Sequence, residues 1–347
     1  ALAGHGAVLT DAGRYQDARS VLAVATEQDP ADDMALVNLA LCCYELGDKA
    51  AAAKTLQQAI AANPFNARAV ADLANCLTAL DHVNGALKLC EEFLQQQPGE
   101  RLVLAAQALA LLNAGQTSAA DRLSNFATLI KVIDLPCPAG FEHMGAFNQA
   151  LAQTICADSS LLNDPVSKST YGGAQTGELD LQIPGCLAAF GAAVNCAVTA
   201  ATAEWLGAGL RNHPLMVPAS QNWSLRAWGT VLRAGGQQTP HLHPLGWISG
   251  VYYAQLPPAM SADAAESGWL EFGQPPRRFF GNHLPTVKRY KPLAGRLILF
   301  PCGSGTGLCL SKALANASAL LSMYCRGTGC AYCDANKKPC RSRVFRH

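Results

Sequence analysis

Two histidines separated by one residue are the clearest candidates for chemistry in this sequence. His241 and His243 flank Leu242, and alternate residues of an extended strand point to the same face. Two imidazoles held side by side can share one metal ion. Isolated pairs of this kind also occur on protein surfaces or in structural roles, so the spacing alone leaves both interpretations open. The preceding residues 235–240, Gly-Gly-Gln-Gln-Thr-Pro, predict a connection between strands that a ligand could approach.

Short strands bounded by glycine and proline are expected to position this pair. They mix β-branched and aromatic residues, which favour strands, and they indicate an all-β barrel or sandwich. An Ala-rich helix is expected to pack against the resulting sheet, and a second helix precedes it. In chain order the expected elements are a helix over 144–156, a loop and strand over 169–181, a helix over 186–206, and strands over 223–236, 241–257, 268–273 and 295–301.

The ordered series of segments in this second half resembles a known family. Residues 237–257 read QQTPHLHPLGWISGVYYAQLP, and GWLEFGQPP (268–276) and KPLAGRLILFP (291–301) follow. The series is similar to the iron(II)/2-oxoglutarate oxygenase superfamily, in the group that carries His-x-His-Pro followed by Ser-Gly-Val-Tyr-Tyr. GGAQTGEL (172–179) resembles the upstream segment of that group. The resemblance implies a double-stranded β-helix (jelly-roll) domain with flanking helices, and iron(II) and 2-oxoglutarate as cofactors.

The same resemblance implies the metal ligands. The superfamily holds iron with two histidines and one carboxylate, which leaves positions open for 2-oxoglutarate and oxygen. His241 matches the first metal ligand, and His243 occupies the slot that usually holds Asp or Glu. Whether His243 binds the metal or only supports the site stays open. Glu271 and Asp263 could each substitute for the carboxylate, or each could be an ordinary surface charge.

The aromatic residues after the histidines gain an expected role in the same way. Tyr252 or Tyr253 could hydrogen-bond the carboxylate of 2-oxoglutarate, although aromatic residues also favour strands for packing alone. Trp247 is expected in the core or the pocket wall rather than as a specific ligand contact.

The end of the chain departs from the family pattern. Thr306 stands where the distal metal-binding His is expected, and Ala-Asn-Ala surrounds position 316, where an Arg is expected to bind 2-oxoglutarate. After the His pair the sequence holds His283, before the strand 295–301, and His347 at the last position. Three hypotheses stay open: a shifted reading frame after about residue 302, a diverged inactive domain, or a substitute ligand such as His283. Back-translation is compatible with a shifted frame, because an alternative frame can encode a His near codon 305 and an Arg near codon 316.

The first part of the chain is an internal repeat with a period of 34 residues. Small residues, turn residues and prolines recur in phase, as expected for closely packed helix pairs joined by tight turns. LGDKAAAAKTLQQAIAANP (46–64) resembles the tetratricopeptide repeat. Three repeats end at Pro98 and an atypical fourth spans about 101–131. The aligned columns are Ala18, Ala52, Ala86 and Ala120; Gly13, Gly47, Asp81 and Gly115; and Pro30, Pro64 and Pro98.

Composition excludes several classes of protein. The 347 residues are 50% hydrophobic and 15% charged with a formal net charge of +1, which excludes a wholly disordered chain and gives no reason to expect nucleic acid. Polar residues interrupt the apolar segment 186–206, so a membrane span is not expected. Six of the 14 cysteines lie in the last 46 residues. We expect these cysteines to form neither a zinc site nor a disulfide framework. We expect a cytoplasmic protein whose first repeat is incomplete, which suggests missing N-terminal residues.

The predicted organisation has four parts. They are tetratricopeptide repeats over 1–131, a linker and helical segment over 132–168, an oxygenase-like domain over 169–310, and a Cys-rich basic tail, interpreted as frameshifted, over 311–347. The expected function is hydroxylation of a protein or small-molecule substrate, with a protein or peptide held on the concave face of the repeats. The alternative is a catalytically inactive repeat scaffold with a degenerate oxygenase-like domain, in which the repeats could also merely support that domain or a dimer.

Overall fold

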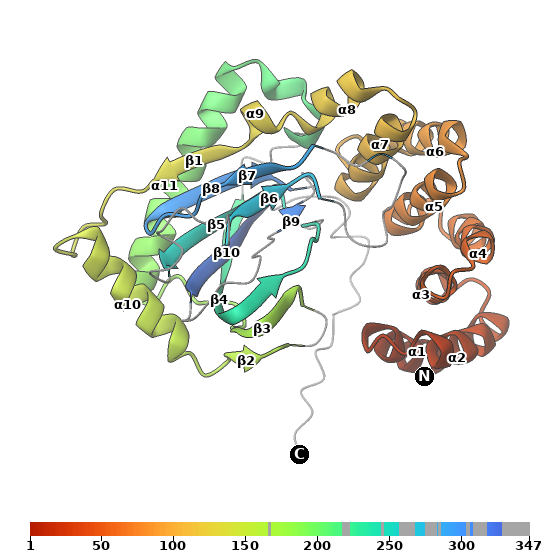
Figure 1. Ribbon diagram of the computed structural model, residues 1–347, viewed down its shortest axis with the longest axis horizontal. Coiled ribbons are helices and arrows are strands. Elements are labelled where there is room, and N and C mark those ends of the chain that lie inside the picture. Colours follow the sequence, from red (N-terminus) through yellow and green to blue (C-terminus); the bar gives the residue numbers. More distant parts are fainter. Residues whose placement is uncertain are drawn as a thin grey trace.

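A computed structural model gives the fold (Figure 1). It describes residues 1–165, 168–216, 223–243, 246–256, 268–274, 283, 286–302, 306–307 and 318–327. A helical solenoid occupies the N-terminal part, and a β-domain with flanking helices follows it. The expected repeat solenoid and β-domain are therefore confirmed as the architecture.

Eight helices form the solenoid as four consecutive pairs. They are α1 (Leu2–Asp11), α2 (Tyr15–Gln28), α3 (Asp33–Glu45), α4 (Lys49–Ala62), α5 (Ala67–Ala79), α6 (Val83–Gln96), α7 (Arg101–Asn113) and α8 (Thr117–Ser124). The repeating alanines, which lie on the second helix of each pair, are at most 2% exposed, so each permits a close helix contact. The residues at the turn within each helix pair recur for a different reason, which is the backbone conformation. Gly13, Gly47 and Gly115 all have positive φ, and Asp81 adopts φ 66° at the same position of its repeat.

In the residues that the structure describes, the β-domain contains two antiparallel sheets. The larger has seven strands in the order β1-β8-β5-β10-β4-β3-β2, and the smaller has three in the order β7-β6-β9. Their strands are β1 (Lys131–Asp134), β2 (Leu162–Asn163), β3 (Thr170–Gln175), β4 (Trp223–Gln238), β5 (Ile248–Gln255), β6 (Leu270–Phe272), β7 (Lys288–Tyr290), β8 (Arg296–Pro301), β9 (Thr306–Gly307) and β10 (Ser318–Gly327). One apolar cluster, with members from both sheets such as Tyr253, Phe272 and Phe300, forms the interior of the domain.

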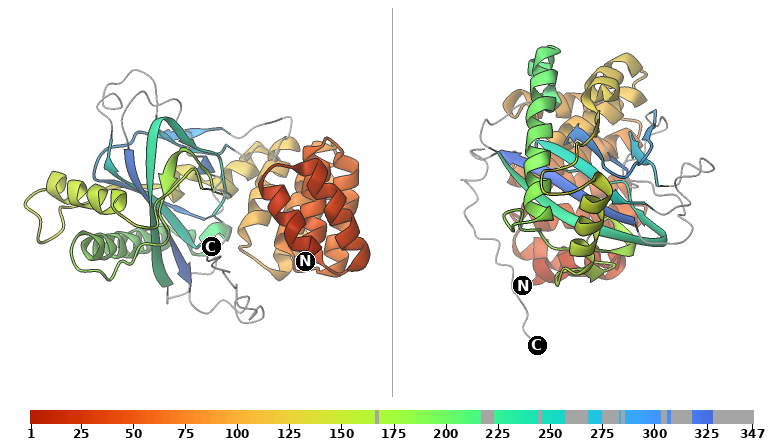
Figure 2. Two further views of the ribbon diagram at one scale, coloured as in Figure 1. Left: turned by 90° about the horizontal axis from the view of Figure 1, so that it is seen from below. Right: turned by 90° about the vertical axis from the view of Figure 1, so that its left-hand side faces the viewer.

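Helices cover the other face of the large sheet. They are α10 (Met144–Cys156) and α11 (Cys186–Gly207), followed by the short 3-10 helices η1 (Leu210–Asn212) and η2 (Pro214–Met216). The short helix α9 (Phe126–Leu129) contributes Leu129 to the cluster on the helix side, and its Phe126 packs against the interior cluster. Figure 2 shows α10 and α11 on the side of the sheet away from the repeats. The α11 helix is long and apolar enough to cross a membrane by length and composition, but Phe190, Val194 and Trp205 on one face are buried in the core against the sheet. The α11 helix therefore acts here as a core helix.

The strand order moves two boundaries of the β-domain. The β1 strand, in the segment expected to be a linker, pairs with β8 through all four of its residues. The β10 strand lies beyond residue 310, where the domain was expected to end, and it pairs with β4 on one side and β5 on the other. The sheet therefore includes residues from 131 to 327.

The solenoid and the β-domain share a packed junction. Leu104 of α7 belongs to the same buried cluster as Leu215 of η2, and the Phe126 and Phe272 rings lie 6.1 Å apart. Asn113, at the end of α7, accepts a hydrogen bond from the His283 backbone at 3.2 Å and donates one back at 3.4 Å. The last helix pair is thus part of both domains.

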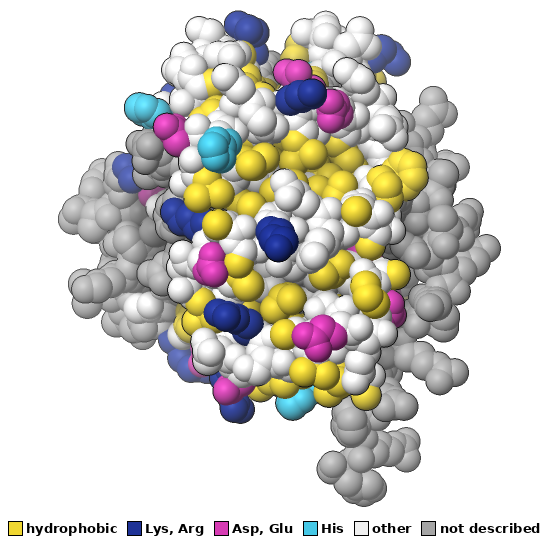
Figure 3. All heavy atoms as spheres, turned by 90° about the vertical axis from the view of Figure 1, so that its right-hand side faces the viewer, with side chains coloured by type: hydrophobic (Ala, Val, Ile, Leu, Met, Phe, Trp, Pro, Cys, Tyr) yellow, Lys and Arg dark blue, Asp and Glu magenta, His cyan; other side chains and the backbone are white. Residues whose placement is uncertain are grey.

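The repeats present one set of helices to the β-domain. In Figure 1, α3 and α5 lie nearer to the sheets than their partners α4 and α6. Figure 3 views the molecule from the repeat side, where basic and acidic side chains are interspersed with apolar ones. A partner lying along the inner helices would therefore lie close to the β-domain.

Candidate functional site

The two histidines of the His-x-His pair lie together, although not on the strand that the sequence predicted. Strand β5 begins only at Ile248, and His241 and His243 lie in the connection between β4 and β5. The expected strand over 241–257 was therefore wrong at its start. Proline at 240 and at 244 explains this, because proline has no N–H to donate to a ladder. The imidazole rings nevertheless lie 4.7 Å apart, centroid to centroid.

Local contacts orient both rings. Nδ1 of His241 lies 2.8 Å from the Thr239 carbonyl oxygen, which assigns the proton to Nδ1. Coordination of a metal by His241 would therefore fall to Nε2. The His243 ring lies 6.1 Å from the Phe300 ring, and its Nδ1 lies 3.4 Å from Ser249 Oγ. Since Phe300 belongs to the interior cluster, His243 sits at the boundary of the space between the two sheets.

The surroundings keep both imidazoles uncharged. Burial lowers the pKa of His241. Burial, with a smaller contribution from the neighbouring His241, lowers the pKa of His243 to about 3. Neutral imidazole is the form that binds metal ions, because the coordinating nitrogen must carry a lone pair. The pair therefore has the protonation state of metal ligands at neutral pH.

The two tyrosines proposed for 2-oxoglutarate lie on opposite faces of β5. Tyr252 faces the helices, and its hydroxyl donates a hydrogen bond to Asn148 Oδ1 at 2.5 Å. Tyr253 faces the interior, where it is fully buried and its hydroxyl has no hydrogen-bond partner among the described residues. Of the two, Tyr253 is the one whose side chain packs in the cluster between the sheets.

A second buried hydroxyl accompanies Tyr253. Thr230 on β4 is fully buried, and within the described part of the chain its Oγ1 also lacks a partner. The register places Thr230 and Tyr253 on either side of the same β10 residue, Leu320. Alternation along β4 puts Thr230 on the same face as Leu232, which belongs to the interior cluster. Sequence reasoning did not find Thr230, because a threonine within a strand carries no signal beyond β-propensity.

The other candidate ligands lie elsewhere. Glu271 is buried on β6, but its carboxylate accepts a hydrogen bond from Arg289 Nε at 2.6 Å, and its neighbours Leu270 and Phe272 are the residues of β6 that belong to the interior cluster. The backbone of His283 is held by Asn113 at the junction with the repeats, and its side chain is exposed. Asp263 and His347 lie outside the described residues.

Trp247 and Thr306 complete the set of predicted positions. Trp247 is buried in the core on the helix side of the large sheet, as expected. Thr306 lies on β9, opposite Phe272 of β6, so the position of the expected distal His is on the small sheet. Across the part of the chain that the structure describes, no group of three or more His, Cys, Asp or Glu side chains could hold a metal ion. Among the described residues, the candidate metal ligands that lie together are His241 and His243.

Comparisons with known families agree with this architecture. The family model "Putative 2OG-Fe(II) oxygenase" matches residues 226–304, which include both histidines, both tyrosines and Thr230. The tetratricopeptide-repeat model matches residues 5–67 and 44–101. The chain therefore joins a region that matches tetratricopeptide repeats to one that matches a putative 2OG-Fe(II) oxygenase family. The chain matches none of the curated proteins compared.

Solved structures resemble each part of this repeat-oxygenase chain separately. A crystal structure of MamA protein is 25% identical over 34% of this chain and 65% of that chain, at a TM-score of 0.32. The chain therefore spans slightly less than two thirds of the MamA structure. A Pseudomonas putida prolyl-4-hydroxylase is 14% identical over 60% of this chain and 97% of that chain, at a TM-score of 0.38. The first TPR of Spaghetti (RPAP3), bound to an HSP90 peptide, is 20% identical over 33% of this chain and 93% of that chain, at a TM-score of 0.31.

Proposed function

We propose that the second domain is an iron(II)- and 2-oxoglutarate-dependent oxygenase that hydroxylates a protein substrate held by the repeats. The observation that carries this proposal is the pair of neutral imidazoles, 4.7 Å apart, within the segment that matches the oxygenase family. Two neutral, adjacent nitrogen donors fit two of the positions on an iron(II) ion.

The residues of the interior fit the two cofactors as follows. His241 and His243 would hold iron(II), with His241 fixed in its tautomer by the Thr239 carbonyl. The Tyr253 and Thr230 hydroxyls would donate hydrogen bonds to carboxylate oxygens of 2-oxoglutarate, which supply the acceptors that both hydroxyls lack. When bound, iron(II) and 2-oxoglutarate supply oxygen activation coupled to loss of carbon dioxide, so that one oxygen atom enters the substrate and one enters succinate.

The apolar interior would protect this chemistry. Val251, Phe272, Ile298 and Phe300 belong to the same buried cluster as Tyr253, and all four are at most 5% exposed. Such a lining excludes bulk water, which strengthens each polar contact inside it. A hydrogen bond from Tyr253 to a carboxylate would therefore contribute more than the same bond at the surface.

Anaerobic titration with iron(II) tests the metal site directly. We expect one equivalent to bind the full chain, and the double variant His241→Ala/His243→Ala to lose that binding. His283→Ala is the matched control, because the His283 side chain is exposed at the repeat junction. Undiminished binding in the double variant, or equal loss in the control, would refute the assignment of the two histidines.

Turnover separates the oxygenase from the second candidate function, a non-catalytic repeat scaffold. The scaffold is favoured by one observation, the lack of a third metal-binding side chain in the described part of the chain. With iron(II), oxygen and 2-oxoglutarate, the oxygenase should release succinate, and the scaffold should release none. The nucleotide sequence over codons 295–347 tests the frameshift hypothesis, which fails if no alternative frame encodes His near codon 305 and Arg about ten codons later.

A further inference from the structure

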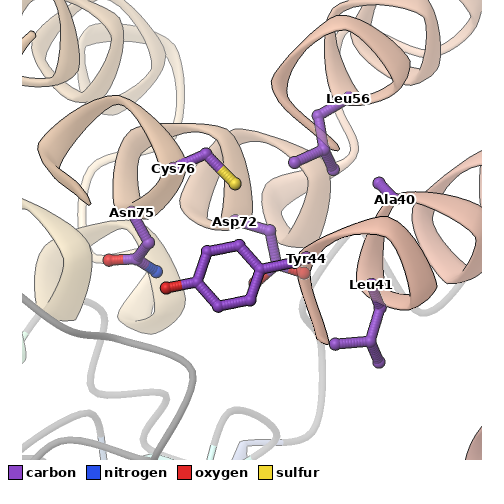
Figure 4. A pocket seen from close by; sticks show the side chains of 7 residues that line it. All are labelled: Ala40, Leu41, Tyr44, Leu56, Asp72, Asn75 and Cys76. Carbon is purple, nitrogen blue, oxygen red and sulfur yellow. The ribbon is translucent and has the colours of Figure 1, made fainter. Parts of the chain in front are cut away.

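Three buried polar side chains near the histidines are bonded to one another. Thr170, Gln175 and Gln238 are at most 8% exposed, and they lie on β3 and β4. In the repeats, by contrast, the hollow between α3, α4 and α5 (Figure 4) has a volume of about 20 Å³, room for one water molecule, so it is a gap in the helix packing. Buried polar side chains are costly to fold, so three of them beside a candidate metal site call for an explanation.

The β3 and β4 strands pair irregularly at this point. The register shifts between Tyr171 and Gly173, and Gly172 between them adopts φ 64°. A Cβ at Gly172 would lie 3.0 Å from the Gly236 Cα, so the two strands approach closely there. A bulge interrupts the backbone ladder and re-aims the strand. Contacts across the bulge can therefore decide how the end of β4 is held, and the chain runs from that end to His241.

The three polar side chains bridge this bulge. Gln238 Nε2 donates a hydrogen bond to Thr170 Oγ1 at 3.2 Å, and Thr170 Oγ1 donates one to Gln175 Oε1 at 3.2 Å. Gln175 pairs with Thr230 on one side of the register shift, and Gln238 pairs with Thr170 on the other. The Thr170 hydroxyl is the central link, because it accepts one bond and uses its single proton in the other.

Backbone hydrogen bonds extend this bridge to the imidazole of His241. The residue after Gln238 is Thr239, whose N–H donates to the Ser169 carbonyl at 2.8 Å. The Thr239 carbonyl in turn lies 2.8 Å from His241 Nδ1. Thr239 is thus held to the β3 side through its N–H and orients the imidazole through its carbonyl. A shift of the end of β4 would move the carbonyl that fixes the His241 tautomer.

We propose that Thr170 is a positioning residue for the His241–His243 pair. Through Gln238 it holds the end of β4 where the Thr239 carbonyl meets His241. The proposal rests on the proposed role of the two histidines as iron ligands, and it names the residue that keeps them in place before the metal binds. Partners that orient metal ligands in this way commonly change metal affinity by about 10–100-fold.

Thr170→Val tests this role, because valine keeps the shape of threonine and removes the hydroxyl. We expect the folded variant to bind iron(II) roughly tenfold more weakly than the unchanged chain in an anaerobic titration. Thr170→Ser keeps the hydroxyl and should restore most of the affinity. The titrations are made well below the melting temperature of every variant, so that a loss of binding does not reflect unfolding.

Thr176→Val is the matched control. Thr176 directly follows β3, is 5% exposed, accepts a hydrogen bond from the Gly229 N–H at 2.9 Å and donates one to the Gly177 carbonyl at 2.7 Å. Its removal also breaks two hydrogen bonds, so the melting temperature should fall as it does in Thr170→Val. Neither partner belongs to residues 238–241, so iron(II) affinity should stay unchanged. A purely structural role of Thr170 predicts the same affinity in both variants.

A measurement without metal separates failure of this proposal from failure of the proposed function. The ¹⁵N chemical shifts of the His241 ring report which nitrogen carries the proton. We expect the proton on Nδ1 in the unchanged chain and in Thr176→Val, and a mixture of tautomers in Thr170→Val. If the unchanged chain shows this pattern but binds no iron(II), the metal site fails and the bridge still fixes the imidazole.

Three results would overturn the positioning role. They are normal iron(II) affinity in Thr170→Val with the proton still on Nδ1, an equal loss of affinity in Thr176→Val, and a failure of Thr170→Ser to restore binding. Gln238→Met takes the place of Thr170→Val if that variant does not fold. It removes one bond of the bridge at similar volume, and the same loss of affinity and the same mixture of tautomers are expected of it.

Discussion

Adjacent tyrosines on β5 give a sharp test of the proposed 2-oxoglutarate site. Tyr252 and Tyr253 are both fully buried, but only the Tyr252 hydroxyl has a partner, Asn148 Oδ1 at 2.5 Å. Removing the hydroxyl of Tyr253 removes an unsatisfied buried group, which costs about 1–3 kcal/mol when the chain holds no ligand. Tyr253→Phe should therefore raise the free energy of unfolding of the protein without cofactors by about 1–2 kcal/mol.

Tyr252→Phe should have the opposite effect. It breaks the hydrogen bond to Asn148 and leaves the Asn148 oxygen without a donor, so we expect a loss of about 1–2 kcal/mol. For a β-domain of this size each kcal/mol shifts the melting temperature by roughly 2–4 °C. The melting temperatures of the two variants should therefore shift in opposite directions relative to that of the unchanged chain, although both variants replace one tyrosine by phenylalanine in the same strand.

Addition of 2-oxoglutarate and iron(II) without oxygen should narrow the difference in stability between the two variants by about 1.4 kcal/mol for each tenfold loss of affinity. Binding stabilises the folded state according to the affinity of the ligand. Loss of a hydrogen bond to a carboxylate should weaken the affinity of Tyr253→Phe by roughly tenfold or more, whereas Tyr252→Phe should retain it. If Tyr253→Phe is destabilised without ligand as strongly as Tyr252→Phe, or binds 2-oxoglutarate normally, Tyr253 is a packing residue and the reasoning fails.

Three further changes probe the fold around the site. Gly229→Ala would place a Cβ 2.4 Å from Ile155 Cγ2, so unfolding in denaturant should show a loss of about 1–3 kcal/mol. Asn113→Ala removes both bonds to the His283 backbone and should accelerate amide exchange at residue 283, but not within β5. Burial raises the pKa of Glu100, so Glu100→Gln should stabilise the protein at pH 7, and this gain should vanish below about pH 4, where both states bind the proton.

The repeats were predictable because their cause is local. A glycine with positive φ in each turn and a buried alanine in each second helix recur with the period of the helix pair, so a single sequence displays the pattern four times. Asp81 fits the turn column without being glycine, because Asp tolerates the left-handed conformation better than most residues.

The β-domain was predictable only in part, because strand order depends on distant partners. The segment 318–327 has no clear alternation of apolar and polar residues, so its residue pattern does not indicate a strand. Its place follows instead from backbone hydrogen bonding, since β10 pairs with β4 and β5 on its two sides. Without it, two inner strand edges would be left unpaired.

The choice between the tyrosines shows the same limit. Alternation along a strand requires Tyr252 and Tyr253 to face opposite sides, but it does not say which side is the interior. That depends on where α10 and its Asn148 pack, which is settled by tertiary contacts. The two prolines around the histidines, by contrast, are visible in the sequence, and the expectation of a strand over 241–257 did not take their missing N–H groups into account.

Two unsatisfied buried hydroxyls mark the proposed 2-oxoglutarate site. Tyr253 and Thr230 would each be less costly to fold as Phe and Val, because an apolar side chain of similar shape needs no partner. A polar group of this kind is explained if a ligand supplies the missing partner. The apolar variant should then be at least as stable as the unchanged chain on its own and should lose the stabilisation that the ligand provides. A residue that serves packing alone cannot show both effects, so the same pair of measurements separates binding from packing at Tyr253 and at Thr230.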